Sequence, residues 1–412
     1  MAWISEGTRR LFGERNFVLY TLGSAVSWPG FFAQTLAVSW LAWELTHSPA
    51  WLAVIAALDI APYFLFGPWG SVLADRHDRH RLLFLTYLLA LAQALALALL
   101  ALLGWLGIGM LGLLAFLHGC IHAFSVPASY GLLPRVVARE NLGAAIAFSS
   151  SYRTLAMFGG PALAGLLLAT FPVPVCFLFN AVGYVAYLEA LRRMRLPPSP
   201  PPAPGGRSVY ADYRDGLRYA LGHPLIGMLL ALTFFADALR GTTHRLLPAF
   251  GERLFATSST GLAMLAGATG LGAAAASLWL SQRRGHARVL AIIQAGMLIG
   301  IGATLVFIAT RDAHLAVAAR LVFGCAAEAA LTGTIILLQA HVEEHYRSRV
   351  MGLWFMVSQL ANLTLLAIGP LAGRYGLDAP LQALCGITLA AWVFFWLRTR
   401  RGGGDASPPA AG

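Results

Sequence analysis

The sequence predicts an all-α membrane protein with twelve transmembrane helices in two six-helix, pseudo-symmetric bundles. Hydrophobic residues make up 58% of the 412 residues and charged residues only 11%, whereas a soluble domain carries about 25% charged residues. Apolar runs of the length that one membrane span needs, about 20 residues, follow one another along the chain. The basic residues gather in alternate loops between those runs. This balance excludes an ordinary soluble enzyme, a disordered protein and a small disulfide scaffold.

The apolar runs are rich in leucine, alanine and glycine and show no alternation of polar and apolar residues. Because strands of a membrane β-barrel are short and alternate, this composition favours helices. The predicted spans cover residues 17–43, 51–74, 82–103, 108–131, 143–170, 172–193, 224–249, 260–281, 287–310, 313–339, 350–372 and 380–397.

The basic residues determine the predicted orientation of the chain. All 29 are arginines, and the net charge is +11. Twelve spans place 22 of these arginines in the termini and loops of one side and only three in the loops of the other side. Since loops rich in basic residues stay in the cytoplasm, we expect both termini to be cytoplasmic. The arginines then face anionic lipid head groups, and the positive charge needs no nucleic acid to explain it.

A polar segment divides the chain into four predicted regions. Residues 1–193 form the first bundle, and residues 194–223 form a cytoplasmic linker with a proline-rich start and an amphipathic helix. Residues 224–400 form the second bundle, and 401–412 form a disordered tail. The proline-rich stretch cannot be helical and is expected to be an extended spacer.

The loop after the second run carries an unusual number of charges beside a glycine. Its candidate functional residues are Gly70, Asp75, Arg76, Asp78, Arg79 and Arg81. The glycine would let the helix pack closely on a neighbour, and the aspartates could pair with arginines or face a helix N-terminus. The simpler interpretation is that these charges only set the topology, but that role needs no aspartate.

This loop, G-x-x-x-A-D-R-x-D-R-x-R over residues 70–81, resembles the conserved loop of the major facilitator superfamily. Three further segments resemble the branch of bacterial macrolide-efflux and enterobactin-exporter-like proteins: LTHSP at 45–49, PRVVARENL at 134–142 and RSRVMG at 347–352. The resemblance covers essentially the whole chain. It implies a transporter rather than an enzyme, working as a monomer in the bacterial inner membrane. In this fold two bundles rock around a central cavity.

The fifth run contains glycines and a proline that can bend a helix and let it pack closely. Gly160, Pro161 and Gly165 resemble the antiporter motif of drug–proton exporters, although Ala164 stands where that motif has a glycine. The resemblance favours export. An ordinary face of small residues that packs on another helix is the alternative.

Ionisable residues within the runs are expensive to place in a membrane and usually face a cavity. The candidates for a proton or substrate cavity are Asp59, Arg153, Asp237, Arg240 and Glu328. Asp237 and Arg240 are three residues apart, so they can neutralise each other.

The two remaining carboxylates are candidates for the residue that carries a proton. A carboxyl buried without a charged partner can bind a proton near neutral pH, which makes Asp59 the first candidate and Glu328 the second. A salt bridge of either residue to Arg153 or Arg320 is the alternative.

Some polar and aromatic residues of the runs suggest further roles. Trp28 and Gln34 could contact an amphipathic substrate in the cavity. His118 and His122 share a helix face and could relay protons or simply pack. No metal site or cofactor is expected, and without lysine the chain has no nucleotide-binding loop.

The sequence therefore predicts a secondary active transporter that exports an amphipathic organic compound, in exchange for protons, by alternating access. A drug, a siderophore or a secondary metabolite would fit this class. A lysophospholipid transporter of the same fold and a non-transporting membrane receptor or scaffold are the alternatives. The expected partners are the small-molecule substrate, protons and membrane lipids.

Overall fold

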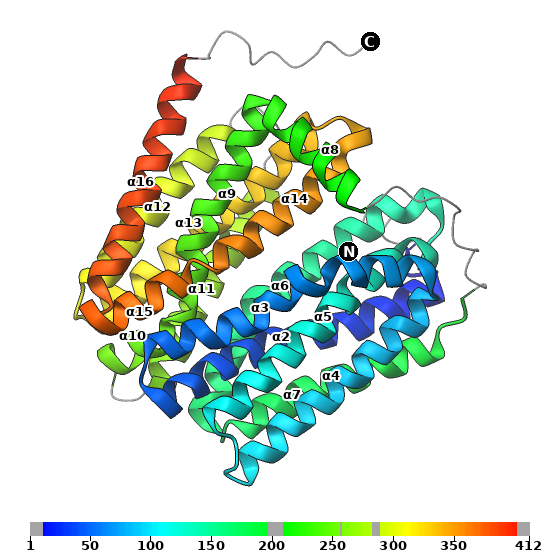
Figure 1. The fold of residues 1–412 in the computed structure, drawn as a ribbon, viewed down its shortest axis with the longest axis horizontal. Coiled ribbons are helices and arrows are strands. Elements are labelled where there is room, and N and C mark those ends of the chain that lie inside the picture. The colour runs from blue at the N-terminus through cyan, green and yellow to red at the C-terminus, as the bar shows by residue number, and fades with distance from the viewer. Residues whose placement is uncertain (1–10, 197–208, 256–257, 282–288, 402–412) are drawn as a thin grey trace. The chain divides into compact units, whose positions relative to one another are not determined.

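The computed structural model describes residues 11–196, 209–255, 258–281 and 289–401. All regular elements in these ranges are helices (Figure 1). Those of the N-terminal half are α2 (Arg15–Thr46), α3 (Pro49–Arg76), α4 (Arg79–Leu102), α5 (Ile108–Val136), a short 3-10 turn at Arg139–Asn141, α6 (Leu142–Thr170) and α7 (Pro174–Arg193).

The C-terminal half begins with the amphipathic helix α8 (Val209–Gly222). It continues with α9 (Pro224–Arg245), α10 (Leu247–Leu254), α11 (Ser258–Ser281), α12 (Val289–Ala309), α13 (Ala313–His341), α14 (Glu344–Asn362), α15 (Leu365–Tyr375) and α16 (Asp378–Arg401).

Ten segments of the described chain are long and apolar enough to cross a membrane. Helix α2 has 32 residues but is not among them, because its buried side carries polar residues such as Thr21, Ser24 and Gln34. In α6, only the shorter segment Leu155–Thr170 is strongly apolar. The protein is thus a multi-pass membrane protein, and the count of twelve spans stays a prediction.

Two predicted spans are interrupted in the structure. The run over 224–249 forms α9 and α10, because Pro248 near the start of α10 has no N–H to continue the hydrogen bonding of α9. The run over 350–372 forms α14 and α15, with a break at Leu363 and Thr364. There the Thr364 hydroxyl bonds to the Ala361 carbonyl at 2.7 Å and competes with the helical hydrogen bonds.

The described chain forms two compact units. The N-terminal unit contains α2, α4, α5, α6, α7 and most of α3, and the C-terminal unit contains α8–α10, α12–α16 and most of α11. Within the N-terminal unit, α2 packs against α6 and α7, while α4 packs against α5 and α7 (Figure 1). Within the C-terminal unit, the closest packing joins α12 to α13 and α9 to α14.

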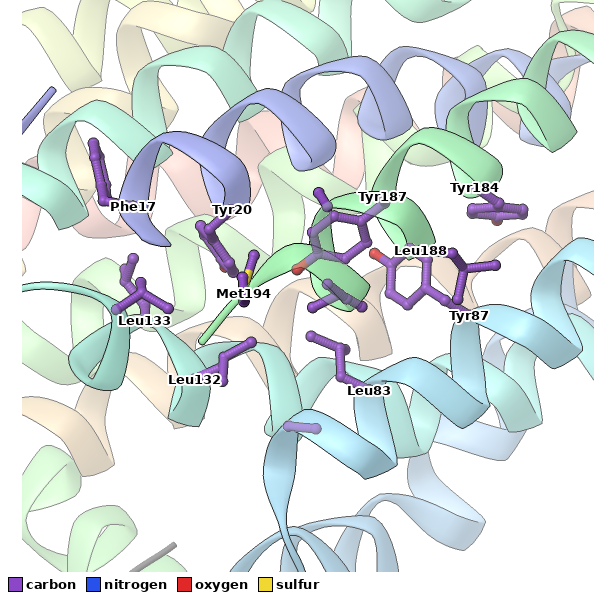
Figure 2. Close-up of a cluster of buried hydrophobic side chains, with 14 of the residues drawn as sticks. Phe17, Tyr20, Leu83, Tyr87, Leu132, Leu133, Tyr184, Tyr187, Leu188 and Met194 are labelled. Atoms are coloured by element: carbon purple, nitrogen blue, oxygen red, sulfur yellow. The ribbon is translucent and has the colours of Figure 1, made fainter. Parts of the chain in front are cut away.

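A cluster of tyrosines fills the core of the N-terminal unit (Figure 2). The ring of Tyr187 on α7 lies 4.5 Å from that of Tyr87 on α4 and 6.1 Å from that of Tyr20 on α2. These edge contacts suit the opposite charge of ring face and ring edge. Gly23 lets α2 approach, since a Cβ there would lie 2.6 Å from the Tyr187 ring. The cluster thereby holds α2, α4 and α7 together.

The core of the C-terminal unit joins α9, α12, α13 and α14 through aliphatic residues such as Leu229, Ile293 and Leu338. Helix α8 packs on α14 through Tyr219, whose ring stacks on that of Tyr346 at 4.2 Å. The Tyr219 hydroxyl also accepts a hydrogen bond from the backbone N–H of Glu343.

Candidate proton and substrate sites

The charged loop between α3 and α4 is held mainly by local hydrogen bonds. Asp78 is the N-cap of α4, and its carboxylate accepts hydrogen bonds from the backbone N–H groups of His80 at 2.8 Å and Arg81 at 3.3 Å. A short polar side chain at this position satisfies N–H groups that the helix start leaves unpaired. Arg135 on α5 lies 3.8 Å from the same carboxylate.

Arg79 connects the end of α3 to α5. Its guanidinium donates to the carbonyl oxygens of Ala74 at 3.2 Å and Gly131 at 3.1 Å. A Cβ at Gly131 would lie 2.5 Å from the arginine nitrogen, so glycine leaves the room that the guanidinium occupies. Gly70 packs just as closely, because a Cβ there would lie 2.3 Å from the carbonyl oxygen of Ala123 on α5.

The remaining residues of this loop contribute less to the described contacts. Arg81 is exposed in the first turn of α4. Asp75 and Arg76 lie in the last turn of α3, and their side chains are outside the described part of the structure.

Asp59 lies in the N-terminal unit beside a histidine. Its Oδ1 accepts a hydrogen bond from Nδ1 of His118 at 2.8 Å. The helices α3 and α5 that carry the two residues approach closely at Gly119, where a Cβ would lie 2.2 Å from the Asp59 carbonyl oxygen. Sequence reasoning missed this partner because 59 positions separate the two residues.

Aromatic residues of α2 surround this pair. The Phe31 ring lies 5.3 Å from the His118 ring and 4.7 Å from the His122 ring. Trp28 packs on Phe31 with ring centroids 5.4 Å apart, and Arg153 on α6 lies 6.0 Å from the centre of the Trp28 ring. Trp28, Phe31 and Arg153 are each half-buried, so part of each side chain is accessible to solvent.

The small residues of α6 allow it to approach this aromatic segment. A Cβ at Gly160 would lie 2.7 Å from Cβ of Phe32 and 2.8 Å from the carbonyl oxygen of Pro29. Pro161 and Gly165 are both buried, and α6 continues through the proline to Thr170. Gly160 thus lets α6 pack closely against α2. A role of these residues in the exchange of substrate for protons stays a prediction.

Gln34, a predicted substrate contact, lies in a buried network of amides. It is only 1% exposed, and its amide forms two hydrogen bonds to other helices. Its nitrogen donates to Gln93 on α4 at 3.1 Å, and its oxygen accepts from Asn180 on α7 at 2.9 Å. A buried amide network of this kind specifies how α2, α4 and α7 fit together.

In the C-terminal unit, Asp237 and Arg240 form the ion pair that their spacing allows. The distance from Nε to Oδ1 is 2.8 Å. The other carboxylate oxygen of Asp237 accepts a hydrogen bond from the Ser358 hydroxyl on α14. Both oxygens of this 2% exposed carboxylate are therefore occupied.

Glu328 on α13 is buried with one oxygen unsatisfied. Its Oε1 accepts a hydrogen bond from the hydroxyl of Thr332 at 2.7 Å, while Oε2 has no hydrogen-bond partner in the part of the chain that the structure describes. The positive charge of Arg240 interacts electrostatically with the Glu328 carboxyl group. A cavity of about 30 Å³ has Asp237, Arg240 and both Ala327 and Leu331 in its lining, which is room for on the order of one or two waters.

Arg320 is fully buried on α13, yet its described hydrogen bonds go to hydroxyls rather than to Glu328. Its guanidinium donates to Thr269 at 3.0 Å and to Thr243 at 3.4 Å. The rings of Phe323 and Phe307 lie 4.6 Å and 5.3 Å away. These threonines were not singled out in the sequence, because a hydroxyl partner on another helix leaves no local pattern.

With this geometry in place, comparison with known proteins identifies the family. The profile of the family described as transmembrane secretion effector matches residues 12–409. The chain belongs to this family of the major facilitator superfamily. The family and its characterised relatives are membrane transporters rather than enzymes.

Characterised relatives of this family member are exporters or transporters of small molecules. It is 28% identical over 319 residues to the enterobactin exporter of Escherichia coli, covering 75% of this chain and 74% of the relative. It is 26% identical to the staphyloferrin A transporter of Staphylococcus aureus and 28% identical to macrolide efflux protein A of Streptococcus pyogenes. Those two matches span less than half of each relative, 42% and 44% of their lengths.

Solved structures show the same fold at low sequence identity. A bacterial homologue of the human lysosomal transporter Spinster, in an inward-facing and occupied conformation, matches with a TM-score of 0.74 and 16% identity. That match covers 96% of this chain and 99% of the other. A bacterial homologue of the iron transporter ferroportin matches with a TM-score of 0.66 and 18% identity, covering 92% and 98%.

Proposed function

We propose that this protein is a secondary active exporter that moves an amphipathic organic compound out of the cytoplasm in exchange for protons, by alternating access. The relatives are named for macrolide efflux and siderophore transport, which supports a drug, a siderophore or a related secondary metabolite as the substrate. Both termini lie in the cytoplasm in this proposal, and one chain forms the working unit.

The observation that carries proton coupling is the carboxyl of Glu328, whose Oε2 has no described hydrogen-bond partner and which interacts electrostatically with Arg240 of the Asp237–Arg240 pair. An ionised carboxylate in a membrane interior is costly unless it is paired. Asp237 already has Arg240 on one oxygen and Ser358 on the other. Among the described residues Glu328 has one hydrogen bond, from Thr332, so a proton on Oε2 would remove a charge that Arg240 compensates only in part.

Protonation changes the charge balance around Arg240. With Glu328 ionised, one guanidinium faces two carboxylates, and the three groups carry a net charge of −1. With Glu328 protonated, the ion pair with Asp237 remains and the net charge is zero. A group that gains or loses one charge in each transport cycle is what exchange of a substrate for a proton requires. The half-buried Arg240 also lines the small cavity. Its interaction with Asp237 therefore changes when Glu328 gains or loses a proton.

Purified protein in liposomes with an imposed pH gradient tests this function. A labelled macrolide, enterobactin and staphyloferrin A serve as probes, and a pH-sensitive dye reports proton flux. We expect the wild type to concentrate at least one probe while it carries protons the other way. Glu328→Gln should lose uphill transport but keep exchange of probe down its gradient, because a neutral amide resembles the protonated carboxyl.

Glu343→Gln is the matched control, since Glu343 is exposed at the start of α14. If Glu328→Gln still concentrates the probe as the wild type does, Glu328 is not the coupling residue. If no gradient-driven transport of any probe occurs in the wild type, the proposed class of substrate is wrong.

A further inference from the structure

A second group of titratable residues, a half-buried aspartate and two buried histidines, lies in the N-terminal unit, and the coupling proposed for Glu328 does not use it. Asp59 on α3 and His118 on α5 share a hydrogen bond of 2.8 Å. The His122 ring lies 4.5 Å from the His118 ring, one helical turn further along α5. Both histidines are buried, with 5% and 4% of their surface exposed.

The hydrogen-bond pattern leaves an open position on each imidazole. Nδ1 of His118 is engaged by Asp59, and Nδ1 of His122 lies 3.3 Å from the Ser125 hydroxyl. The Nε2 atoms of both rings are buried and have no hydrogen-bond partner among the described residues. A pair of histidines that served packing alone would be expected to satisfy these atoms, because an unpaired buried polar group is destabilising.

Groups on α2, α6 and α7 lie around this cluster. Helix α2 presents the aromatic rings of Trp28 and Phe31. Tyr184 on α7 interacts electrostatically with Asp59, and Arg153 on α6 lies against the Trp28 ring. Within the described residues, Asp59 is thus the anionic group in direct contact with an imidazole here, so a proton on His118 would be neutralised by it.

We propose that Asp59, His118 and His122 form a separate proton-binding site in the N-terminal unit, which holds one exchangeable proton on the Asp59–His118 pair. When the proton is bound, His118 is an imidazolium paired with the Asp59 carboxylate. When it is released, His118 is neutral and still donates from Nδ1 to the carboxylate. The adjacent His122 ring disfavours a second proton, because two imidazolium ions in contact repel each other.

The contact with the Asp59 carboxylate makes His118 the proton acceptor of the site, whereas His122 stays neutral. His118 is oriented by Asp59, as a hydrogen bond at one ring nitrogen determines what the other nitrogen can do. Nε2 of His118 is then the atom that accepts or gives up the proton. His122, which lacks a carboxylate contact among the described interactions, stays neutral and limits the site to a single proton.

Direct titration tests the site without any transport assay. The full-length protein, labelled with 15N-histidine and placed in phospholipid nanodiscs, is followed by NMR, because the 15N shifts of the ring distinguish imidazolium from each neutral tautomer. The spectrum of His118→Gln is subtracted to assign His118, and His118→Asn serves the same purpose if the glutamine variant does not fold. His314→Gln, which removes an exposed histidine next to Asp312, is the control.

We expect the His118 ring to gain one proton in a single step as the pH is lowered, while the His122 ring stays neutral over the same range. In Asp59→Asn the midpoint of the His118 titration should fall by about one pH unit or more, because the neutralising charge is lost. The His314 control should leave the midpoint unchanged.

A His118 that stays neutral across the whole range would overturn the proposal, and so would an Asp59→Asn midpoint equal to that of the wild type. Since no substrate is present, the outcome does not depend on the coupling proposed for Glu328. If His118 titrates and Glu328→Gln still couples transport to the proton gradient in vesicles, the Asp59–His118 site is kept and the coupling role of Glu328 is rejected.

Discussion

Thr332 donates a hydrogen bond of 2.7 Å to Oε1 of Glu328 from one turn further along α13, and this contact leaves Oε2 as the open atom of the carboxyl. The relationship is local to one helix, since residues four apart lie on the same face. It gives a way to change the proton affinity of Glu328 without removing the carboxyl itself.

Thr332→Val keeps the shape of the side chain and removes this hydrogen bond. Because the hydroxyl stabilises the ionised form, we expect the proton to be held to higher pH, and the midpoint of the pH dependence of transport should rise by about half to one pH unit. The rate of transport in vesicles, measured over a range of internal pH, checks this. Thr334→Val is the control, because the Thr334 hydroxyl donates its hydrogen bond to the Ala330 carbonyl on the same helix.

Breaking the Asp237–Arg240 ion pair should destabilise the C-terminal unit. Arg240→Gln leaves the buried Asp237 carboxylate without its counter-ion, a loss of about 3–5 kcal/mol when one partner of a buried pair is removed. The double variant Asp237→Asn, Arg240→Gln removes both charges and should recover most of the thermal stability. A double variant no more stable than Arg240→Gln would show that the two side chains do not act as a pair.

Two glycines of α3 provide a matched test of helix packing. A Cβ at Gly70 would lie 2.3 Å from a backbone oxygen of α5, whereas a Cβ at Gly67 would meet nothing within 4 Å. Gly70→Ala should therefore lower the free energy of unfolding by about 1–3 kcal/mol, while Gly67→Ala should have little effect or stabilise α3 slightly. Thermal unfolding of the two variants in detergent distinguishes them, and equal midpoints would contradict the close packing.

The start of α13 should show an acid-dependent stability. Asp312 is the N-cap of this helix, and the hydrogen bond from the Leu315 N–H lowers its pKa below the usual 3.8. A lowered folded-state pKa means that the stabilisation is present above the unfolded value and is lost as the pH falls through the folded value. Asp312→Ala should thus be less stable than the wild type at pH 7, and the difference should shrink below about pH 4. A difference that is unchanged at acid pH would exclude the carboxylate as its source.

The predicted orientation can be tested by reporter fusions. Because 22 of the 29 arginines lie on one side in a twelve-span arrangement, a reporter after residue 106 should be outside and one after residue 206 should be inside. The reverse fusion result would reject this arrangement.

The charged loop between α3 and α4 gives a separate prediction. Asp75→Asn should insert normally, since the arginines that set the topology remain, but should impair transport. Full transport by Asp75→Asn would reduce that loop to a topology signal.

The sequence by itself determined where the apolar helices run and which charges are unusual. Span length and the distribution of arginine are properties of the chain read in one dimension, so Asp59, Asp237, Arg240 and Glu328 could be singled out before any contact was known. The Asp237–Arg240 pair could also be proposed, because both residues lie on one helix at a spacing that joins them.

Only the tertiary structure decided which of those groups have partners on other helices. Asp59 meets His118 because α3 and α5 approach at Gly119, and Gln34 is occupied because α4 and α7 bring amides to it. Such contacts depend on how helices rotate and pack, and a shift of about one residue along a helix turns a side chain by roughly 100° to another face. No periodicity within a single helix carries that information, and this is why the imidazole partner of Asp59 was absent from the prediction.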